Sequence, residues 1–362
     1  MKSEYNIALV GELNGCIETT LEVLAQRDFP VGKVFPLVNA GDIFKTNSSS
    51  PSDEDFEENE NENEFESNIN SVMFSGKTVD VIDIETFDWQ QVDIAFFLTD
   101  IETTKKWATV ASEFCVVIDN SGTFLEDENV PLLQVDVNEE SLARYTEKNI
   151  ISIPSSESAQ LSLAIKQIQQ EVGLVRINVC SYHSVSVAGK PGVTTLAGET
   201  ARLLNAKTVE TSTFPQQTAF NVFPQVGELN EEGVSFGELR LVNEIRSLLN
   251  DPSIIVSSTQ VVVPMFYGCA QAVHLQTHYP LDLEEVAHAL HHTEGLSLAD
   301  SVCDYPNMID NVVGNADVKI GRLRKDVCDA SGINLWVCAD NVYFGVATNA
   351  IKVAEKLIQT YI

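Results

Sequence analysis

Short apolar runs alternate with helical periodicities over the first 150 residues of the chain. Residues 5–11 predict a buried strand, residues 18–27 a helix and residues 34–38 a second strand. Further strands are expected at 78–84, 92–98, 115–119 and 132–135, with a helix at 102–112. Strands that alternate with helices predict a mostly parallel, doubly wound sheet. We therefore expect an α/β fold whose first domain is Rossmann-like.

The pattern changes after residue 152, where longer runs alternate with a period of two. Strands are expected at 175–186, 253–264, 270–278 and 333–339, with helices at 192–204, 236–249 and 282–291. This predicts an α+β domain with a mixed or antiparallel sheet and helices on one face, a sheet that commonly supports a dimer. We expect one domain over 1–151, completed by a C-terminal helix within 342–362, and a dimerisation and catalytic-type domain over 152–341.

An acidic low-complexity segment interrupts the first domain at residues 47–71. It consists mainly of Ser, Asp, Glu and Asn, with little to bury, and a solvated loop is the interpretation we adopt. The whole chain has 362 residues and a formal net charge of −31, which argues against nucleic acid or an anionic membrane as a partner.

Cysteine usage and hydropathy indicate the compartment. Seven cysteines at irregular spacing form no CxxC pair, as expected of reduced thiols. No apolar run is long enough to span a bilayer, and no secretory signal precedes the first strand. We expect a cytoplasmic protein.

The most suggestive stretch for chemistry follows the strand at residues 150–153. Pro154 and two serines lead into an amphipathic helix, so that Ser156 lies at a helix N-terminus, where backbone N–H groups stabilise an anion. A nucleophile with a lowered pKa belongs at such a position, and cysteine suits it best. Here the residue is serine, with Glu157 beside it.

The turn after the first strand is a second candidate, as a dinucleotide-binding loop. The phosphate fingerprint needs three glycines, and only Gly11 fits, because Asn14 and Ile17 occupy the other positions. Glu12 adds negative charge where phosphates would lie. An ordinary strand-to-helix turn is the interpretation we favour.

A series of motifs in order suggests a family. They are Asp119-Asn120-Ser121, the run 185–190, the run 213–217, the run 219–221, Pro264-Met265-Phe266-Tyr267-Gly268, the run 332–336 and Ala339-Asp340-Asn341. Together they resemble aspartate-semialdehyde dehydrogenase of the bacterial type. That family reduces aspartyl phosphate with NADPH through a cysteine thioester and forms dimers or tetramers of dimers. The resemblance covers the chain except its acidic insert.

The resemblance implies a site residue at each matching position, and most have changed. The family's nucleophilic cysteine corresponds to Ser156, its general-base histidine to Cys269 and its orienting glutamine to His183. The substrate-binding arginine corresponds to Val262, the phosphate-binding arginine to Leu125 and a lysine to Arg240. For cofactor binding, the resemblance implies that Gly11 and Asn341 are the retained residues.

Three other chemistries were weighed against plain structural roles. Ser156 with His183 could form a hydrolase pair, but no nucleophile elbow surrounds the serine. Cys269 could be a new nucleophile, although a buried structural thiol is the simpler interpretation. His288 and His292 have a spacing that could hold a metal, without an accompanying carboxylate motif, and we expect no metal site.

These losses together predict a protein without dehydrogenase activity. The chain resembles the Usg-type paralogues of the family, which keep the fold and the dimer without the catalytic set. We expect a homodimer with a binding or structural role and no cofactor. The alternative is an NAD- or NADP-dependent oxidoreductase acting on an aldehyde or acyl-phosphate substrate.

Overall fold

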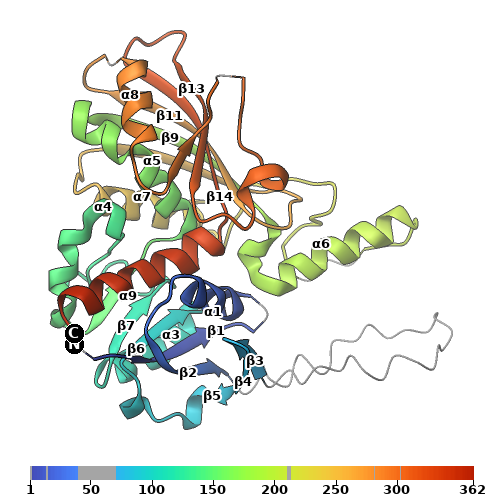
Figure 1. Ribbon diagram of the computed structural model, residues 1–362. Coiled ribbons are helices and arrows are strands. Elements are labelled where there is room, and N and C mark those ends of the chain that lie inside the picture. Colours follow the sequence, from blue (N-terminus) through green and yellow to red (C-terminus); the bar gives the residue numbers. More distant parts are fainter. Residues whose placement is uncertain (1, 14, 40–70, 210–212, 281, 302) are drawn as a thin grey trace.

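The computed structural model describes residues 2–13, 15–39, 71–209, 213–280, 282–301 and 303–362 (Figure 1). Residues 47–70 of the predicted acidic loop therefore lie outside the described residues. Two six-stranded sheets account for most of the architecture, and each is covered by helices.

The first sheet is entirely parallel, with the order β5-β2-β1-β6-β7-β8. Its strands are β1 (Tyr5–Gly11), β2 (Val31–Val38), β5 (Ile82–Asp83), β6 (Ile94–Leu98), β7 (Val116–Asp119) and β8 (Ile150–Ser152). Helices α1 (Cys16–Gln26) and α3 (Ile101–Ser112) connect them. The predicted doubly wound sheet is confirmed.

Two predicted strands of the first sheet were wrong in detail. Two short strands replace the single strand predicted at 78–84. The first, β4 (Lys77–Asp80), pairs with β3 (Ser71–Phe74) in a separate hairpin, and the second is β5 of the parallel sheet. Residues 132–135 form no strand, because Leu132 makes only an isolated bridge with Ser152 before α4 (Val135–Asn138) begins.

The second sheet is mixed, with the order β10-β9-β11-β14-β13-β12. Its strands are β9 (Leu174–His183), β10 (Ile255–Val262), β11 (Cys269–Thr277), β12 (Leu296–Leu298), β13 (Val318–Lys325) and β14 (Gly332–Ala339). β10 runs parallel to β9, and β12 to β13, whereas the central pairs are antiparallel.

Helices α5 (Ser156–Val172), α7 (Phe236–Leu248) and α8 (Leu283–His291) lie beside this sheet, whereas α6 (Gly189–Leu204) projects from the body (Figure 1). The last helix, α9 (Asn349–Thr360), lies where the two sheets meet (Figure 1). Its Ile351, Ala354 and Leu357 belong to the same core cluster as strand β1. The C-terminal helix therefore packs on the first sheet.

The helices among the described residues include none with the length and apolar character needed to cross a membrane.

Candidate functional site

Helix α5 begins where the sequence places it, with Ser155 as the N-cap. The Ser155 hydroxyl accepts a hydrogen bond from the backbone N–H of Ser158 at 3.4 Å. Ser156 is the first helical residue, and its hydroxyl donates to the Glu157 carboxylate at 3.3 Å. A Cβ built on Gly345 would lie 2.2 Å from the Ser156 Cβ, so the backbone of residue 345 packs directly against this side chain. The hydroxyl has an acidic neighbour rather than a strong base.

Carboxylates occupy the N-terminus of α5, where an anion would otherwise bind. The Glu244 carboxylate accepts hydrogen bonds from the Ser155 backbone N–H at 3.0 and 3.2 Å and from its hydroxyl at 2.8 Å. Glu244 is 1% exposed and Glu157 is 7% exposed. The free N–H groups that make a helix start attractive to a phosphate are therefore partly used by the protein's own carboxylate.

The Arg240 side chain links helix α7 to the loop that follows β7. Its Nε donates to Glu244 at 2.7 Å, and its two terminal nitrogens donate to the carbonyls of Ser121 at 3.2 Å and Asn120 at 2.8 Å. Burial lowers the pKa of Arg240, but the carboxylates of Glu244, Glu157 and Asp119 outweigh it, for a net rise. The guanidinium therefore fixes the loop after β7 to α7.

Three of the predicted site residues lie in one row of the second sheet. His183 on β9 is opposite Cys269 on β11 and beside Val262 on β10, and each is at most 3% exposed. Burial raises the pKa of the Cys269 thiol well above its usual value, with a further rise from Glu157. Burial lowers the pKa of His183, which Glu157 only partly opposes, so the imidazole is neutral near pH 7. The row holds a protonated thiol and an uncharged imidazole.

Leu125 lies apart from that row. It is half-buried in the turn after β7, and its backbone N–H donates to the Gly122 carbonyl at 3.3 Å. An aliphatic side chain there offers no charge to a phosphate group.

The candidate cofactor turn is shaped for close packing. A Cβ on Gly11 would lie 2.8 Å from the Leu98 carbonyl oxygen, which explains glycine at the end of β1. At the start of α1 the Glu18 carboxylate accepts from the Gly15 N–H at 2.9 Å. Burial, followed by Glu12 and Glu18, raises the pKa of Cys16 to about 11.

These residues do not fit a dinucleotide diphosphate at α1. Two carboxylates place negative charge at the helix N-terminus, where a diphosphate needs unpaired N–H groups. Asn341 is also engaged, because its side-chain oxygen accepts from the Gly268 N–H at 2.8 Å and from the Ser186 hydroxyl at 3.2 Å.

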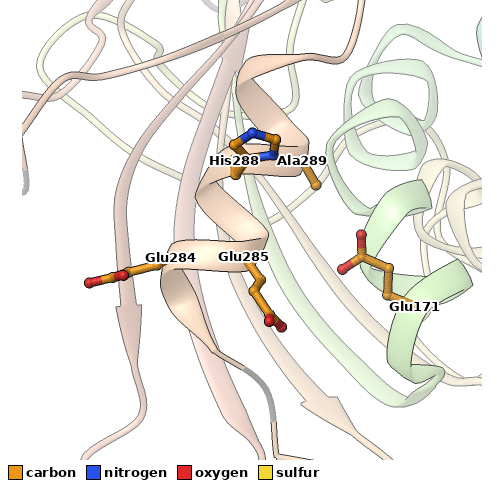
Figure 2. A pocket seen from close by; sticks show the side chains of 5 residues that line it. All are labelled: Glu171, Glu284, Glu285, His288 and Ala289. Carbon is orange, nitrogen blue, oxygen red and sulfur yellow. The ribbon is translucent and has the colours of Figure 1, made fainter.

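The predicted histidine positions form no metal site in the part of the chain that the structure describes, which holds no group of three or more potential ligands. The rings of His288 and His292 lie 4.2 Å apart between centroids. His288 also lines an open pocket with Glu171, Glu284, Glu285 and Ala289 (Figure 2). Glu171 is near the C-terminal end of α5, about 22 Å from Ser156 at 1.5 Å per helical residue. This pocket is separate from the candidate site.

Four residues of the site are not among those expected from the sequence: Gln160, Glu244, Gln260 and Gln271. All four are at most 1% exposed. Gln160 is four residues after Ser156 and therefore on the same helix face, which was a readable signal. For Gln260 and Gln271, the readable signal was a polar side chain at an inward-facing position of a strand.

Comparison with known proteins agrees with this architecture. A family model described as "Semialdehyde dehydrogenase, dimerisation domain" matches residues 165–344. A second, "Semialdehyde dehydrogenase, NAD binding domain", matches residues 42–145 and so leaves out β1 and α1. Over all 362 residues, and the whole of the relative, the chain is 42% identical to "Aspartate-semialdehyde dehydrogenase 2" of Vibrio cholerae.

The chain belongs to the aspartate-semialdehyde dehydrogenase family. A Shewanella violacea member of that name is 37% identical over the full length of both chains. Among solved structures, aspartate semialdehyde dehydrogenase II of Vibrio cholerae complexed with ASA has a TM-score of 0.89 and 41% identity, with all of both chains covered. A probable aspartate-semialdehyde dehydrogenase of Pseudomonas aeruginosa has a TM-score of 0.87 and 31% identity, covering 99% of this chain and 100% of its own. The predicted family and fold class are confirmed.

Proposed function

We propose that this protein is a homodimeric member of the family that does not reduce an acyl phosphate through an enzyme-bound thioester. The observation that carries the proposal is the chemistry of Ser156 and of the row that holds His183, Cys269 and Val262. The family resemblance puts a cysteine at that position, a histidine at Cys269 and an arginine at Val262. None of these three groups is present.

The hydroxyl of Ser156 cannot replace a thiolate in this setting. Serine is not ionised near neutral pH and needs an adjacent base to attack a carbonyl or acyl phosphate. Its hydrogen-bond partner is the carboxylate of Glu157, and no imidazole pairs with the hydroxyl among the described residues. The Cys269 thiol is completely buried and protonated, so it is not a substitute.

Anion recognition is missing as well. Val262 and Leu125 stand where the resemblance implies arginines, and bidentate arginines are the main charge-assisted ligands of carboxylate and phosphate. Arg240 retains its charge, but its three donor nitrogens are used by Glu244, Asn120 and Ser121. These features support the proposed resemblance to the Usg-type paralogues.

The second candidate is an oxidoreductase that uses NAD or NADP with an aldehyde or acyl-phosphate substrate. The comparisons favour this candidate, because full-length relatives up to 42% identical carry the dehydrogenase name and a NAD binding domain is matched. A nicotinamide nucleotide would supply a hydride. The charge at the start of α1 argues against the usual diphosphate position, so this candidate needs a different mode of cofactor binding.

The domain division and location belong to the same proposal. We place one domain at 1–151 with 342–362 and the dimerisation domain at 152–341. All seven cysteines are unpaired, which supports a cytoplasmic location.

A titration with NADP and NAD separates the two candidates. The purified dimer is heated with increasing nucleotide, and the midpoint of unfolding is followed. The first candidate predicts no saturable rise in Tm up to millimolar nucleotide. A saturable rise with either nucleotide would favour the oxidoreductase instead.

A further inference from the structure

One part of the sheet face that α5 covers is polar. Strand register places Ser181 beside Gln260 and Gln271 in one row, and His183 beside Cys269 in the next. All five side chains are at most 3% exposed. We call these residues, with Gln160 and Glu157 of α5 above them, the polar patch.

Several polar atoms of the polar patch have no hydrogen-bond partner. Among the described residues none pairs with His183 Nε2 or with the side-chain oxygens of Gln260 and Gln271, whereas the Gln160 side chain hydrogen-bonds to the Cys269 thiol. The amide orientations are fixed, because Gln260 Nε2 donates to the Glu157 carboxylate at 3.4 Å and Gln271 Nε2 donates to the Glu157 carbonyl at 3.1 Å. Two of these three unpaired atoms are therefore carbonyl oxygens. Buried acceptors without donors are rare in folded proteins and mark a place for a ligand or water.

Negative charge also exceeds positive charge among the buried side chains around the polar patch. The carboxylates of Glu157 and Glu244 are 7% and 1% exposed, and both act electrostatically on Arg240. The direct ion pair of Arg240, at 2.7 Å, is with Glu244. Glu157 keeps only weaker contacts, at 3.3 Å to the Ser156 hydroxyl and 3.4 Å to Gln260. A buried carboxylate needs a cationic or donor-rich partner.

We infer that the polar patch binds a hydrogen-bond-donating cation, either an ammonium ion or the ammonium group of a small amine. Its ligands are the Glu157 carboxylate and the carbonyl oxygens of Gln260 and Gln271. A phosphate or carboxylate would bring further acceptors and negative charge to a place that has both in excess. The inference rests on the proposed function in one respect, that this site no longer takes an anion.

Thermal unfolding in different salts tests the inference without nucleotide or substrate. The dimer is titrated with ammonium chloride, methylammonium chloride, potassium chloride or sodium phosphate, with sodium chloride added to hold the ionic strength constant. We expect a saturable rise in Tm with ammonium or methylammonium and none with potassium, which matches ammonium in charge but donates no hydrogen bond. A response to ammonium alone indicates the free ion, and a stronger response to methylammonium indicates an amine.

Substitutions assign the response to the polar patch. Glu157→Gln should raise the half-saturating concentration of ammonium about tenfold or more, since a charge-assisted hydrogen bond is lost. Glu171→Gln, an exposed carboxylate on the same helix, is the matched control and should leave it unchanged. Gln271→Leu gives a second test if Glu157→Gln does not fold.

Equal responses to potassium and ammonium, or no saturable response to any amine, would overturn the inference. A response that survives both Glu157→Gln and Gln271→Leu would overturn it too. None of these outcomes bears on acyl-phosphate reduction, which is measured separately.

Discussion

Arg240→Ala tests whether this arginine is a structural contact or a ligand-binding residue. The substitution removes three side-chain hydrogen bonds and leaves Glu244, which is 1% exposed, without its cation. Breaking a buried ion pair by removing one partner costs about 3–5 kcal/mol. We expect Arg240→Ala to lower the free energy of unfolding by that amount.

Two further variants make the comparison quantitative. Arg240→Lys keeps the charge but cannot bond Glu244 and both carbonyls at once, and we expect a loss of about 2 kcal/mol at ~1 kcal/mol per hydrogen bond. Arg246→Ala on the same helix is the matched control. Arg246 donates one hydrogen bond, to the Ile254 carbonyl at 2.9 Å, and its removal should cost about 1 kcal/mol.

Urea unfolding gives the overall loss, and hydrogen exchange shows where it occurs. A chain with two domains can unfold in more than one step, so the site of the loss must be measured locally. Exchange is therefore followed in residues 120–122 and 154–158, which contact Arg240 and Glu244. Arg240→Ala should increase exchange in both segments, whereas Arg246→Ala should not. If Arg240→Ala is no less stable than Arg246→Ala and exchange is unchanged, the structural role is wrong and a ligand-binding role gains support.

The remaining predictions concern the candidate site. Ser156→Cys alone should give no measurable aspartyl-phosphate reduction, assayed by NADPH absorbance, and turnover would show that the family positions are misassigned. Iodoacetamide at pH 7 should label the exposed Cys303 but not the buried Cys269, because burial raises the pKa of the Cys269 thiol well above its usual value. Labelling is measured by mass spectrometry of the native protein, and similar labelling of the two cysteines would contradict this prediction. Gly345→Ala should cost about 1–3 kcal/mol in urea unfolding, because its Cβ would lie 2.2 Å from that of Ser156, and an unchanged midpoint would disprove that contact. Burial raises the pKa of Asp119, so protonation of this carboxyl stabilises the fold below about pH 4, and the contribution is lost as the pH rises through the folded-state pKa. Asp119→Asn should therefore gain stability relative to the unmodified chain as the pH rises above about 4, and parallel pH profiles of the two proteins would refute the shift.

Hydrophobic periodicity predicts most of the fold because it is a local signal. The runs predicted at 5–11 and 92–98 have continuously apolar centres at 7–10 and 94–98, as expected for strands covered on both faces, and they become β1 and β6. The start of α5 after Pro154 is equally local. By contrast, Leu132 forms a single bridge to Ser152, and the helix beginning at Val135 leaves no room for the predicted strand.

The arrangement of the candidate site depends on contacts between distant parts of the chain. Glu244 reaches Ser155 across 89 residues, and Arg240 reaches the carbonyl of Asn120 across 120 residues. No periodicity in the sequence reports such pairs. The substitutions at Ser156, Cys269 and Val262 could be predicted from the family resemblance, whereas the excess of buried carboxylates and unpaired amides could be found only in the structure.

The rate of aspartyl-phosphate reduction is the most direct test of the account. The purified protein is incubated with aspartyl phosphate and NADPH, and NADPH absorbance is compared with that of the same protein carrying Ser156→Ala. We predict that both proteins match the rate without protein. Turnover by the unmodified chain that Ser156→Ala abolishes would contradict the account, because it would show that the serine hydroxyl does the work of the family's thiolate.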